Sequence, residues 1–189
     1  MTGIGIIGLG KSGLDIHVPC IAAVPELQLI AGCDTTPARR ELAERRIPGI
    51  HTYADPGEFL ADERVRVAVV TTPTAGHEAI ALQALAAGKD VLVDKPLALD
   101  LRGADRILQA ARETGRFVTL FQNRRWEPSF LCIQQLLADG VAGRVLGIES
   151  RRVRLDSTLA YPAREFHPAW RQEKRFGGGV INDCVPHDL

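Results

Sequence analysis

Residues 4–13 read Ile-Gly-Ile-Ile-Gly-Leu-Gly-Lys-Ser-Gly, a short apolar run that passes into three closely spaced glycines. The run before Gly8 is typical of a buried strand. Gly8, Gly10 and Gly13 form a G-x-G-x-x-G pattern. In this pattern the first glycine permits a tight turn, the second lets the backbone approach a pyrophosphate, and the third lets a helix pack on the strand. The stretch therefore predicts a dinucleotide-binding turn.

A helical segment is expected to follow the third glycine and to end near Val24. Its first backbone amides would face the phosphates, with Lys11 and Ser12 at the tip of the turn as further cofactor-binding candidates. Pro19 interrupts the segment, and because proline lacks an N–H it either opens the helix late or kinks it.

The rest of the first 122 residues alternates between short apolar runs and longer stretches rich in Ala, Leu, Glu and Arg. The apolar runs lack the alternation of half-exposed strands, which indicates a parallel sheet covered by helices on both faces. The predicted fold class is α/β, a Rossmann doubly wound parallel sheet. Strands are expected at 4–7, 27–33, 65–71, 90–93 and 117–121, and helices at 37–45, 55–60, 76–87 and 101–113, the last capped by Asp100 and followed by Gly115.

An acidic residue, Asp34, ends the expected strand 27–33. A carboxylate placed there can accept hydrogen bonds from the adenosine ribose hydroxyls of a dinucleotide. Asp34 favours NAD because it would repel the 2′-phosphate of NADP, whereas Arg39 and Arg40 could hold that phosphate. The two arginines are equally well explained as solvated charges on a helix. We expect NAD or NADP as cofactor, with NAD favoured.

The composition excludes several classes of protein. The 189 residues carry 23 Lys and Arg against 23 Asp and Glu, so no net field favours nucleic acid or a membrane surface. The apolar start lacks a basic flank and is too short for a signal peptide or a spanning helix. The four cysteines are far apart and form no C-x-x-C, which argues against a disulfide framework or a zinc site. Four free thiols fit a cytoplasmic location.

The character of the sequence changes after residue 121. Residues 127–138 read as a helix ended by Gly140, and residues 145–155 read as a strand that alternates apolar and charged side chains. One helix, one strand and a loop cannot close a sheet. We therefore expect a dinucleotide-binding domain over 1–122 and the beginning of an incomplete α+β domain for substrate and oligomerisation over 123–189. A full-length form is expected to be a homo-oligomer, and the truncated chain could bind cofactor without turnover.

Two further motifs follow expected strands. Residues 69–77 read Val-Val-Thr-Thr-Pro-Thr-Ala-Gly-His, and residues 91–97 read Val-Leu-Val-Asp-Lys-Pro-Leu. With the glycine pattern, they resemble the Gfo/Idh/MocA oxidoreductases, named for glucose-fructose oxidoreductase, inositol dehydrogenase and a rhizopine-catabolism protein. The similarity continues to the end of the chain and is closest to the branch of scyllo-inositol dehydrogenases. It runs through Gln-Asn-Arg-Arg-Trp at 122–126, Trp-Arg at 170–171, Gly-Gly-Gly at 177–179, Asp183 and His187.

The resemblance implies that Lys95 lies beside the nicotinamide ring, since the family places the lysine of its Glu/Asp-Lys-Pro motif there. The position at the carboxyl end of a parallel strand agrees with this role. Asp94 replaces the commoner Glu, which keeps the charge and shortens the reach. A cis peptide before Pro96 occurs in relatives, and the sequence does not decide it here.

Asp183 and His187 complete the catalytic candidates. Hydride transfer from a carbinol needs a base for the hydroxyl proton, and His187 is the natural choice because histidine titrates near neutrality. Asp183 would hold a substrate hydroxyl or orient the imidazole, and Lys95 would stabilise developing alkoxide charge. The roles of Lys95 and His187 could be exchanged. Pro186 predicts a kink or helix break just before His187.

The remaining candidates border the cofactor or the substrate. Helix capping explains His77 equally well, and a structural anchor explains Trp170 nearly as well. No clustered Cys or His spacing supports a metal site. The cofactor-side candidates are Thr72, Pro73, Thr74, His77 and Gln122, and the substrate-side candidates are Asn123, Trp170 and Arg171.

These observations leave two functions open. The first is a dehydrogenase that uses NAD or NADP to oxidise a secondary hydroxyl of a small sugar or cyclic polyol, or to reduce the ketone. The second is a dinucleotide-binding sensor or regulator of the same fold without catalysis. The combination of Lys95, Asp183 and His187 favours the enzyme, because a pure binder needs none of them.

Overall fold

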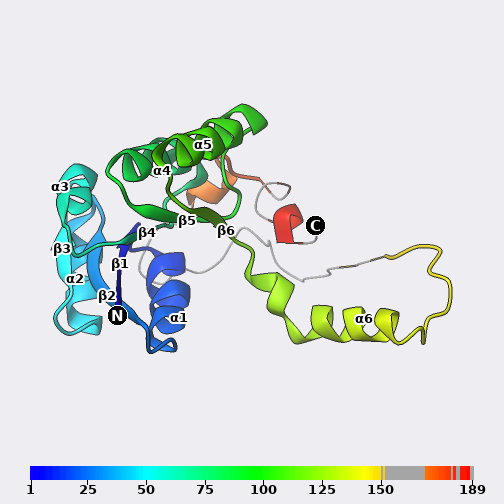
Figure 1. Cartoon of the computed structure of the whole chain (residues 1–189). Helices are drawn as coiled ribbons and strands as arrows, with labels where there is room; N and C mark the ends of the chain where they lie inside the picture. The colour runs from blue at the N-terminus through cyan, green and yellow to red at the C-terminus, as the bar shows by residue number, and fades with distance from the viewer. Residues whose placement is uncertain (150, 152–168, 180, 182–183, 188–189) are drawn as a thin grey trace.

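The computed structural model describes residues 1–149, 151, 169–179, 181 and 184–187. Its centre is a six-stranded parallel sheet in the order β3-β2-β1-β4-β5-β6 (Figure 1). This arrangement confirms the α/β Rossmann prediction. The strands are β1 (Thr2–Ile7), β2 (Leu27–Cys33), β3 (His51–Tyr53), β4 (Val67–Val70), β5 (Asp90–Asp94) and β6 (Val118–Phe121).

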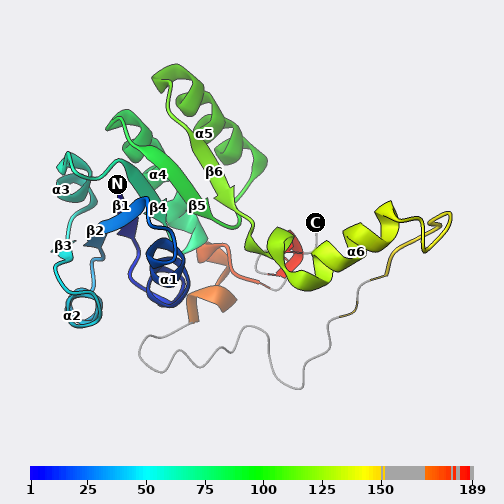
Figure 2. The same cartoon turned by 60° about the horizontal axis from the view of Figure 1, so that its bottom comes forward.

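Helices cover both faces of the sheet (Figures 1 and 2). Those that pack on it are α1 (Val18–Ala22), α2 (Pro37–Arg46), α3 (Pro56–Ala61), α4 (His77–Ala86) and α5 (Leu101–Thr114). After β6 come the 3-10 helix η3 (Asn123–Trp126) and α6 (Pro128–Ala138). The later described residues form three short 3-10 helices, η4 (Ala169–Gln172), η5 (Lys174–Phe176) and η6 (Val185–His187).

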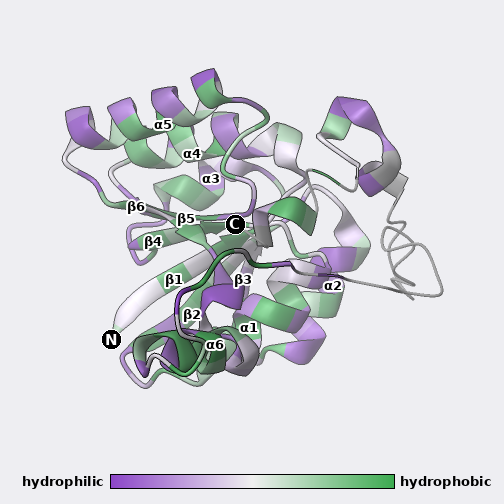
Figure 3. Cartoon of the chain, turned by 90° about the vertical axis from the view of Figure 1, so that its right-hand side faces the viewer, coloured by the Kyte–Doolittle hydropathy of each residue, from purple (hydrophilic) through white to green (hydrophobic). Residues whose placement is uncertain are grey.

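The apolar strands explain the layered structure, because each face of the sheet buries its own cluster. One cluster joins the sheet to α3, α4 and α5 through Phe59, Leu85 and Ile107, all fully buried. The other joins it to α1 and α2 through Ile21 and Leu42. Figure 3 shows hydrophilic residues on the outward side of α5. Burial on both faces accounts for strands without apolar-polar alternation.

The expected elements of the first domain are confirmed, with strand ends within two residues and helix ends within one. Asp100 caps α5 by accepting a hydrogen bond from the Gly103 amide at 2.8 Å, and Gly115 ends it in the left-handed region at φ +64°. The sequence did not predict β3. Its three residues pair with β2 at the edge of the sheet, and so short a strand carries no periodic signal.

The segment after the glycine turn differs from a plain helix. Ser12–His17 form a single π-helical stretch (η1), in which the Val18 amide donates to the Gly13 carbonyl, before α1 begins. Pro19 lies in the first turn of α1, where its missing N–H is tolerated. The helical backbone is already continuous from Ser12, so Pro19 does not open the helix late.

The expected strand at 145–155 is wrong for the part that the structure describes. Residues 145–149 are irregular, and most of 150–155 lies outside the described residues. A strand needs a neighbour to take its backbone hydrogen bonds, and no described segment pairs with 145–149. α6 extends away from the sheet (Figures 1 and 2) and buries no residue, so Leu131 is exposed, and Val145 beyond the helix is exposed as well.

Candidate active site

The glycine turn lies where the strand order reverses. β1 is paired with β2 on one side and β4 on the other, and open α/β sheets bind ligands at the carboxyl ends of the strands that flank such a point. The Thr71 hydroxyl, just after β4, donates to the Gly8 carbonyl at 2.5 Å. This bond fixes the turn against the neighbouring strand.

The space available for a side chain differs among the three glycines of the turn. Gly8 has φ +105°, and a Cβ there would lie 2.8 Å from the backbone at Thr71. A Cβ on Gly13 would lie 2.3 Å from the Gly8 carbonyl oxygen, so only glycine lets the helix start approach the strand. At Gly10 no described atom lies within 4 Å of the added Cβ. The turn thus has open space at the position where a pyrophosphate needs close access to the backbone.

Asp34 follows β2 and is buried beside the turn. Its Oδ2 accepts the Leu9 amide at 3.0 Å and faces the Arg39 guanidinium at 3.3 Å, while Oδ1 accepts the Thr36 amide at 2.8 Å. Arg40 donates to the Asp34 backbone carbonyl at 2.6 Å. A carboxylate has about four acceptor positions, so Asp34 keeps one for a ribose hydroxyl while Arg39 is in place.

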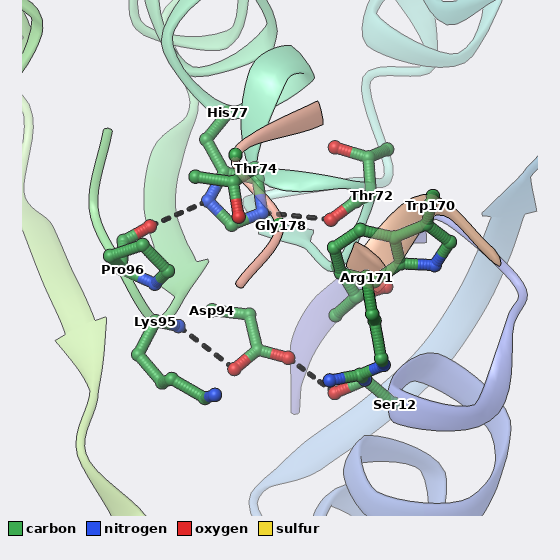
Figure 4. A pocket seen from close by; sticks show the side chains of 12 residues that line it. Ser12, Thr72, Thr74, His77, Asp94, Lys95, Pro96, Trp170, Arg171 and Gly178 are labelled. Carbon is green, nitrogen blue, oxygen red and sulfur yellow. Dashed lines mark hydrogen bonds between the residues drawn. The ribbon is translucent and has the colours of Figure 1, made fainter. Parts of the chain in front are cut away.

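Lys95 lies at the carboxyl end of β5, as predicted. The Lys95 amide donates to Oδ1 of Asp94 at 2.9 Å, and the Ser12 hydroxyl donates to Oδ2 of the same carboxylate (Figure 4). The peptide between Lys95 and Pro96 is cis. Asp94 thus connects the glycine turn to the strand end that carries the candidate lysine.

The loop after β4 contains the next candidates. Thr74 begins the 3-10 helix η2 (Thr74–Gly76), which follows Pro73 and leads into α4. His77 is 1% exposed, and its ring nitrogens lie 2.7 Å from the Pro96 carbonyl oxygen and 2.8 Å from the Thr72 carbonyl oxygen (Figure 4). His77 therefore bridges the loops after β4 and β5, and its side chain makes no capping hydrogen bond to α4, so the capping interpretation is wrong.

A pocket brings the glycine turn, these two loops and a distant segment of the chain together (Figure 4). The distant segment contributes Trp170 and Arg171, whose guanidinium lies 4.8 Å from the Trp170 ring centroid. The pocket is lined by Ser12, Thr71, Thr72, Thr74, His77, Asp94, Lys95, Pro96, Trp170, Arg171, Gly177 and Gly178. The structure therefore unites cofactor-side and substrate-side candidates.

Glycine lets the distant segment turn tightly at the pocket. Gly177 has φ +73°, and a Cβ there would approach the Leu99 side chain to 2.4 Å. A Cβ on Gly178 would lie 2.4 Å from the Arg171 carbonyl oxygen, and the Gly179 amide donates to that oxygen at 2.8 Å. A side chain at Gly177 or Gly178 would therefore not fit without a shift of its neighbours.

The last described residues reach the end of β6. The Gln122 side-chain amide donates to the Pro186 carbonyl at 2.5 Å. His187 ends the helix η6, which begins at Val185, but its side chain lies outside the described residues, as does Asp183. Asn123 begins η3, and this substrate-side candidate is exposed and does not line the pocket.

Several polar atoms near the pocket are buried without a hydrogen-bond partner. They include Oγ1 of Thr72, Oε1 of Gln122 and Nε2 of His17. Buried polar atoms are rarely left unsatisfied, so such atoms indicate a missing partner. Together with the open space at Gly10, they fit a polar cofactor bound along this edge of the sheet.

Two residues of this region were missed by sequence reasoning, His17 and Thr71. His17 is 3% exposed, its ring centroid lies 4.3 Å from that of Phe121, and its Nε2 lies 4.0 Å from Oδ2 of Asp94. Burial lowers the pKa of His17, and the charge of Asp94 partly opposes this shift. A histidine in the helical segment directly after the glycine turn was the available signal.

The part of the chain that the structure describes contains no helix of the length and apolarity that a membrane crossing requires. Within the same residues, no group of three or more His, Cys, Asp or Glu side chains is arranged to hold a metal ion.

Comparisons with known proteins agree with this geometry. The chain is 33% identical over 188 residues to the uncharacterized oxidoreductase YdgJ of Escherichia coli (strain K12), covering 98% of the chain and 51% of YdgJ. It is 27% identical over 184 residues to scyllo-inositol 2-dehydrogenase (NADP(+)) IolW of Bacillus subtilis (strain 168), covering 97% of the chain and 49% of IolW. The chain thus spans about half the length of these relatives.

A solved structure shares the same architecture. The crystal structure of an NAD-binding protein from Listeria innocua matches with a TM-score of 0.88 at 29% identity, over 98% of this chain and 52% of that one. The model of the oxidoreductase family with an NAD-binding Rossmann fold, GFO_IDH_MocA, matches residues 2–122. The chain belongs to the Gfo/Idh/MocA family of oxidoreductases.

Proposed function

We propose that this chain is the cofactor-binding half of a dehydrogenase that transfers a hydride between a nicotinamide dinucleotide and a secondary hydroxyl or ketone of a sugar or cyclic polyol. The observation that carries the proposal is the bond from the Ser12 hydroxyl to the Asp94 carboxylate. It ties the phosphate turn to the strand end that bears Lys95, and Ser12 of the turn and Lys95 line one pocket, which supports a cofactor bound beside the candidate lysine. The name of IolW supports a polyol substrate.

In the proposed chemistry the two hydrogens of the carbinol go to different acceptors. The hydrogen on carbon leaves as a hydride, and the hydrogen on oxygen leaves as a proton. The bound nicotinamide supplies the hydride acceptor. The Lys95 ammonium polarises the substrate oxygen and stabilises the alkoxide that forms as the hydride leaves. His187 takes the hydroxyl proton and Asp183 holds a substrate hydroxyl or orients the imidazole. The reverse assignment, with Lys95 as proton acceptor, uses the same atoms.

The cofactor-side residues have distinct proposed tasks. The backbone of Gly8, Gly10 and Gly13, with Lys11 and Ser12, holds the pyrophosphate. Asp34 accepts a ribose hydroxyl, which favours NAD. The pairing of Arg39 with Asp34 supports NADP as the alternative, because Arg39 can turn from the carboxylate to a 2′-phosphate. The loop at Thr72–Thr74 and the side chain of Gln122 border the nicotinamide.

The second part of the chain supports the substrate side. Trp170 and Arg171 line the pocket beside Lys95 and would contact the substrate, with Asn123 further out. We propose that residues 123–189 begin the substrate and oligomerisation domain of a homo-oligomer. Their contact with the end of β6 through Gln122 supports this arrangement.

The test begins with binding of the 189-residue chain to NADH and NADPH, followed by turnover assays of a full-length form with each oxidised dinucleotide and a panel of sugars and cyclic polyols. Lys95→Ala is compared with Lys174→Ala, which removes an exposed lysine outside the pocket. We expect turnover to be lost in Lys95→Ala and kept in Lys174→Ala. Failure to bind either dinucleotide contradicts the proposal, as does equal turnover in wild type and Lys95→Ala.

The same assays test the alternative function. A sensor would bind a dinucleotide as tightly as an enzyme, yet no compound of the panel would change the nicotinamide absorbance, and Lys95→Ala would leave binding unaltered. That pattern would contradict the dehydrogenase proposal and support the non-catalytic sensor.

A further inference from the structure

The side chain of His17 has a buried nitrogen without a partner beside the proposed active site. The imidazole is 3% exposed and packs against Phe121, and its Nε2 makes no hydrogen bond. Oδ2 of Asp94 lies 4.0 Å from this nitrogen. A hydrogen bond from nitrogen to oxygen requires about 2.7–3.2 Å, so these two atoms lie near each other without a bond.

The Asp94 carboxylate is already engaged on the side that faces the pocket. Its Oδ1 accepts the Lys95 amide, and its Oδ2 accepts the Ser12 hydroxyl. Ser12 and His17 therefore converge on the same oxygen from the same segment. One of them holds the oxygen, while the other lies just beyond bonding distance.

The π-helical stretch makes this convergence possible. Ser12 and His17 are its first and last residues. In an α-helix, residues five apart would differ by about 140° around the axis and face different directions. The i to i+5 bonding of a π-helix brings them close to the same face. The local distortion thus directs both side chains at Asp94, and such distortions are frequent at functional sites.

Ser12 has a second acceptor when a dinucleotide binds. It follows Gly10 at the tip of the phosphate turn and lines the pocket. A hydroxyl at that position can donate either to a carboxylate or to a phosphate oxygen. If the Ser12 hydroxyl donated to the ligand, Oδ2 of Asp94 would lose its hydroxyl donor. The nearby Nε2 of His17 would still have no hydrogen-bond partner.

We propose that His17 is a positioning residue that takes over Oδ2 of Asp94 when Ser12 turns to the bound dinucleotide. The exchange rests on the proposed function, and it keeps the carboxylate oriented next to Lys95 in the loaded site. Burial lowers the pKa of His17, and the charge of Asp94 partly opposes this shift, so burial favours the neutral imidazole. With its N–H on Nε2, that imidazole can donate to Oδ2 of Asp94. The exchange converts two unsatisfied groups into one buried hydrogen bond.

The experiment compares variants of the 189-residue chain. His17→Leu removes the donor, His17→Gln returns an N–H near the position of Nε2, and His51→Leu removes an exposed histidine on β3 as control. We expect NADH affinity to fall about tenfold in His17→Leu and to stay near wild type in His17→Gln and His51→Leu. Equal affinity in wild type and His17→Leu would overturn the exchange.

Side-chain nitrogen NMR on the histidines gives a readout that does not depend on a stable His17 variant. The His17 signals should move toward the hydrogen-bonded Nε2–H form when NAD⁺ is added to the wild type. Ser12→Ala should produce a similar shift without ligand, because Asp94 has then lost its hydroxyl donor. Unchanged His17 signals in both samples overturn the exchange even where NAD⁺ binds. Failure of the wild type to bind NADH or NAD⁺ contradicts the proposed function and the exchange together.

Discussion

The Gln122 side chain donates a hydrogen bond of 2.5 Å to the backbone carbonyl of Pro186, 64 positions later in the chain. It attaches the helix that ends at His187 to the carboxyl end of β6. The carboxyl ends of β1, β4 and β5 carry the glycine turn, the Thr72 loop and Lys95 along the same edge. One side-chain amide thus joins Pro186, the residue before His187, to the edge of the sheet that carries the proposed site.

Gln122→Glu tests this attachment, because a carboxylate keeps the size of the amide but cannot donate to a carbonyl. We expect turnover to fall about threefold to tenfold, the cost of one neutral hydrogen bond, in a dehydrogenase assay. NADH affinity should change less than turnover. A variant with unaltered turnover would show that the Pro186 contact does not position the reacting groups.

Two glycine substitutions should separate binding from folding. Gly10→Ala leaves the fold intact because no described atom lies within 4 Å of the new Cβ, but it blocks pyrophosphate access. NADH affinity should fall about tenfold to a hundredfold with an unchanged melting curve. Gly13→Ala meets the Gly8 carbonyl oxygen at 2.3 Å and should lower the free energy of unfolding by about 1–3 kcal/mol. Equal melting curves for the two variants would contradict this division.

Arg39 should set the preference between NAD and NADP. Arg39→Ala removes the guanidinium beside the Asp34 carboxylate, so we expect NADPH affinity to fall about tenfold or more while NADH affinity is kept or improved. Arg45→Ala, an exposed change on the same helix α2, serves as control in the same fluorescence titrations. If Arg39→Ala lowered the affinities for NADH and NADPH equally, Arg39 would stabilise the fold and would not select between the two cofactors.

The cap of α5 gives a stability test remote from the site. Asp100→Ala removes the acceptor of the Gly103 amide and should cost about 1 kcal/mol in denaturant unfolding. Asp105→Ala, exposed in the same helix, should change the unfolding free energy by less than about 0.5 kcal/mol. If the two variants lose the same stability, the cap does not contribute as argued.

The four thiols should differ in reactivity. Burial raises the pKa of Cys33 to about 12, with the Asp34 carboxylate adding to the shift, so Cys33 stays protonated at mildly alkaline pH. Because the thiolate is the reactive form, iodoacetamide should label the exposed Cys20 and Cys132 in the native protein and Cys33 only after unfolding. Mass spectrometry identifies the labelled sites. Native labelling of Cys33 at the rate of Cys20 would contradict the burial of the end of β2.

Much of the first domain could be predicted from local signals. Buried strands, helix caps such as Asp100 and the turn at Gly8 depend on neighbours within a few residues, so their patterns survive in the linear chain. The edge strand β3 could not be found this way, because three residues acquire strand geometry only through pairing with β2. The expected strand at 145–155 failed over residues 145–149 for the same reason, since alternation supplies no partner.

The sequence by itself determined the α/β class, the phosphate turn and the position of Lys95 at a strand end, because these follow from periodicity and short motifs. Only the tertiary structure decided that Ser12 and His17 both reach Asp94, that His77 bridges two loops, and that Trp170 enters the pocket. Such contacts join residues far apart in the chain. They depend on sheet order, strand pairing and a local π-helical turn, and no short sequence window contains that information.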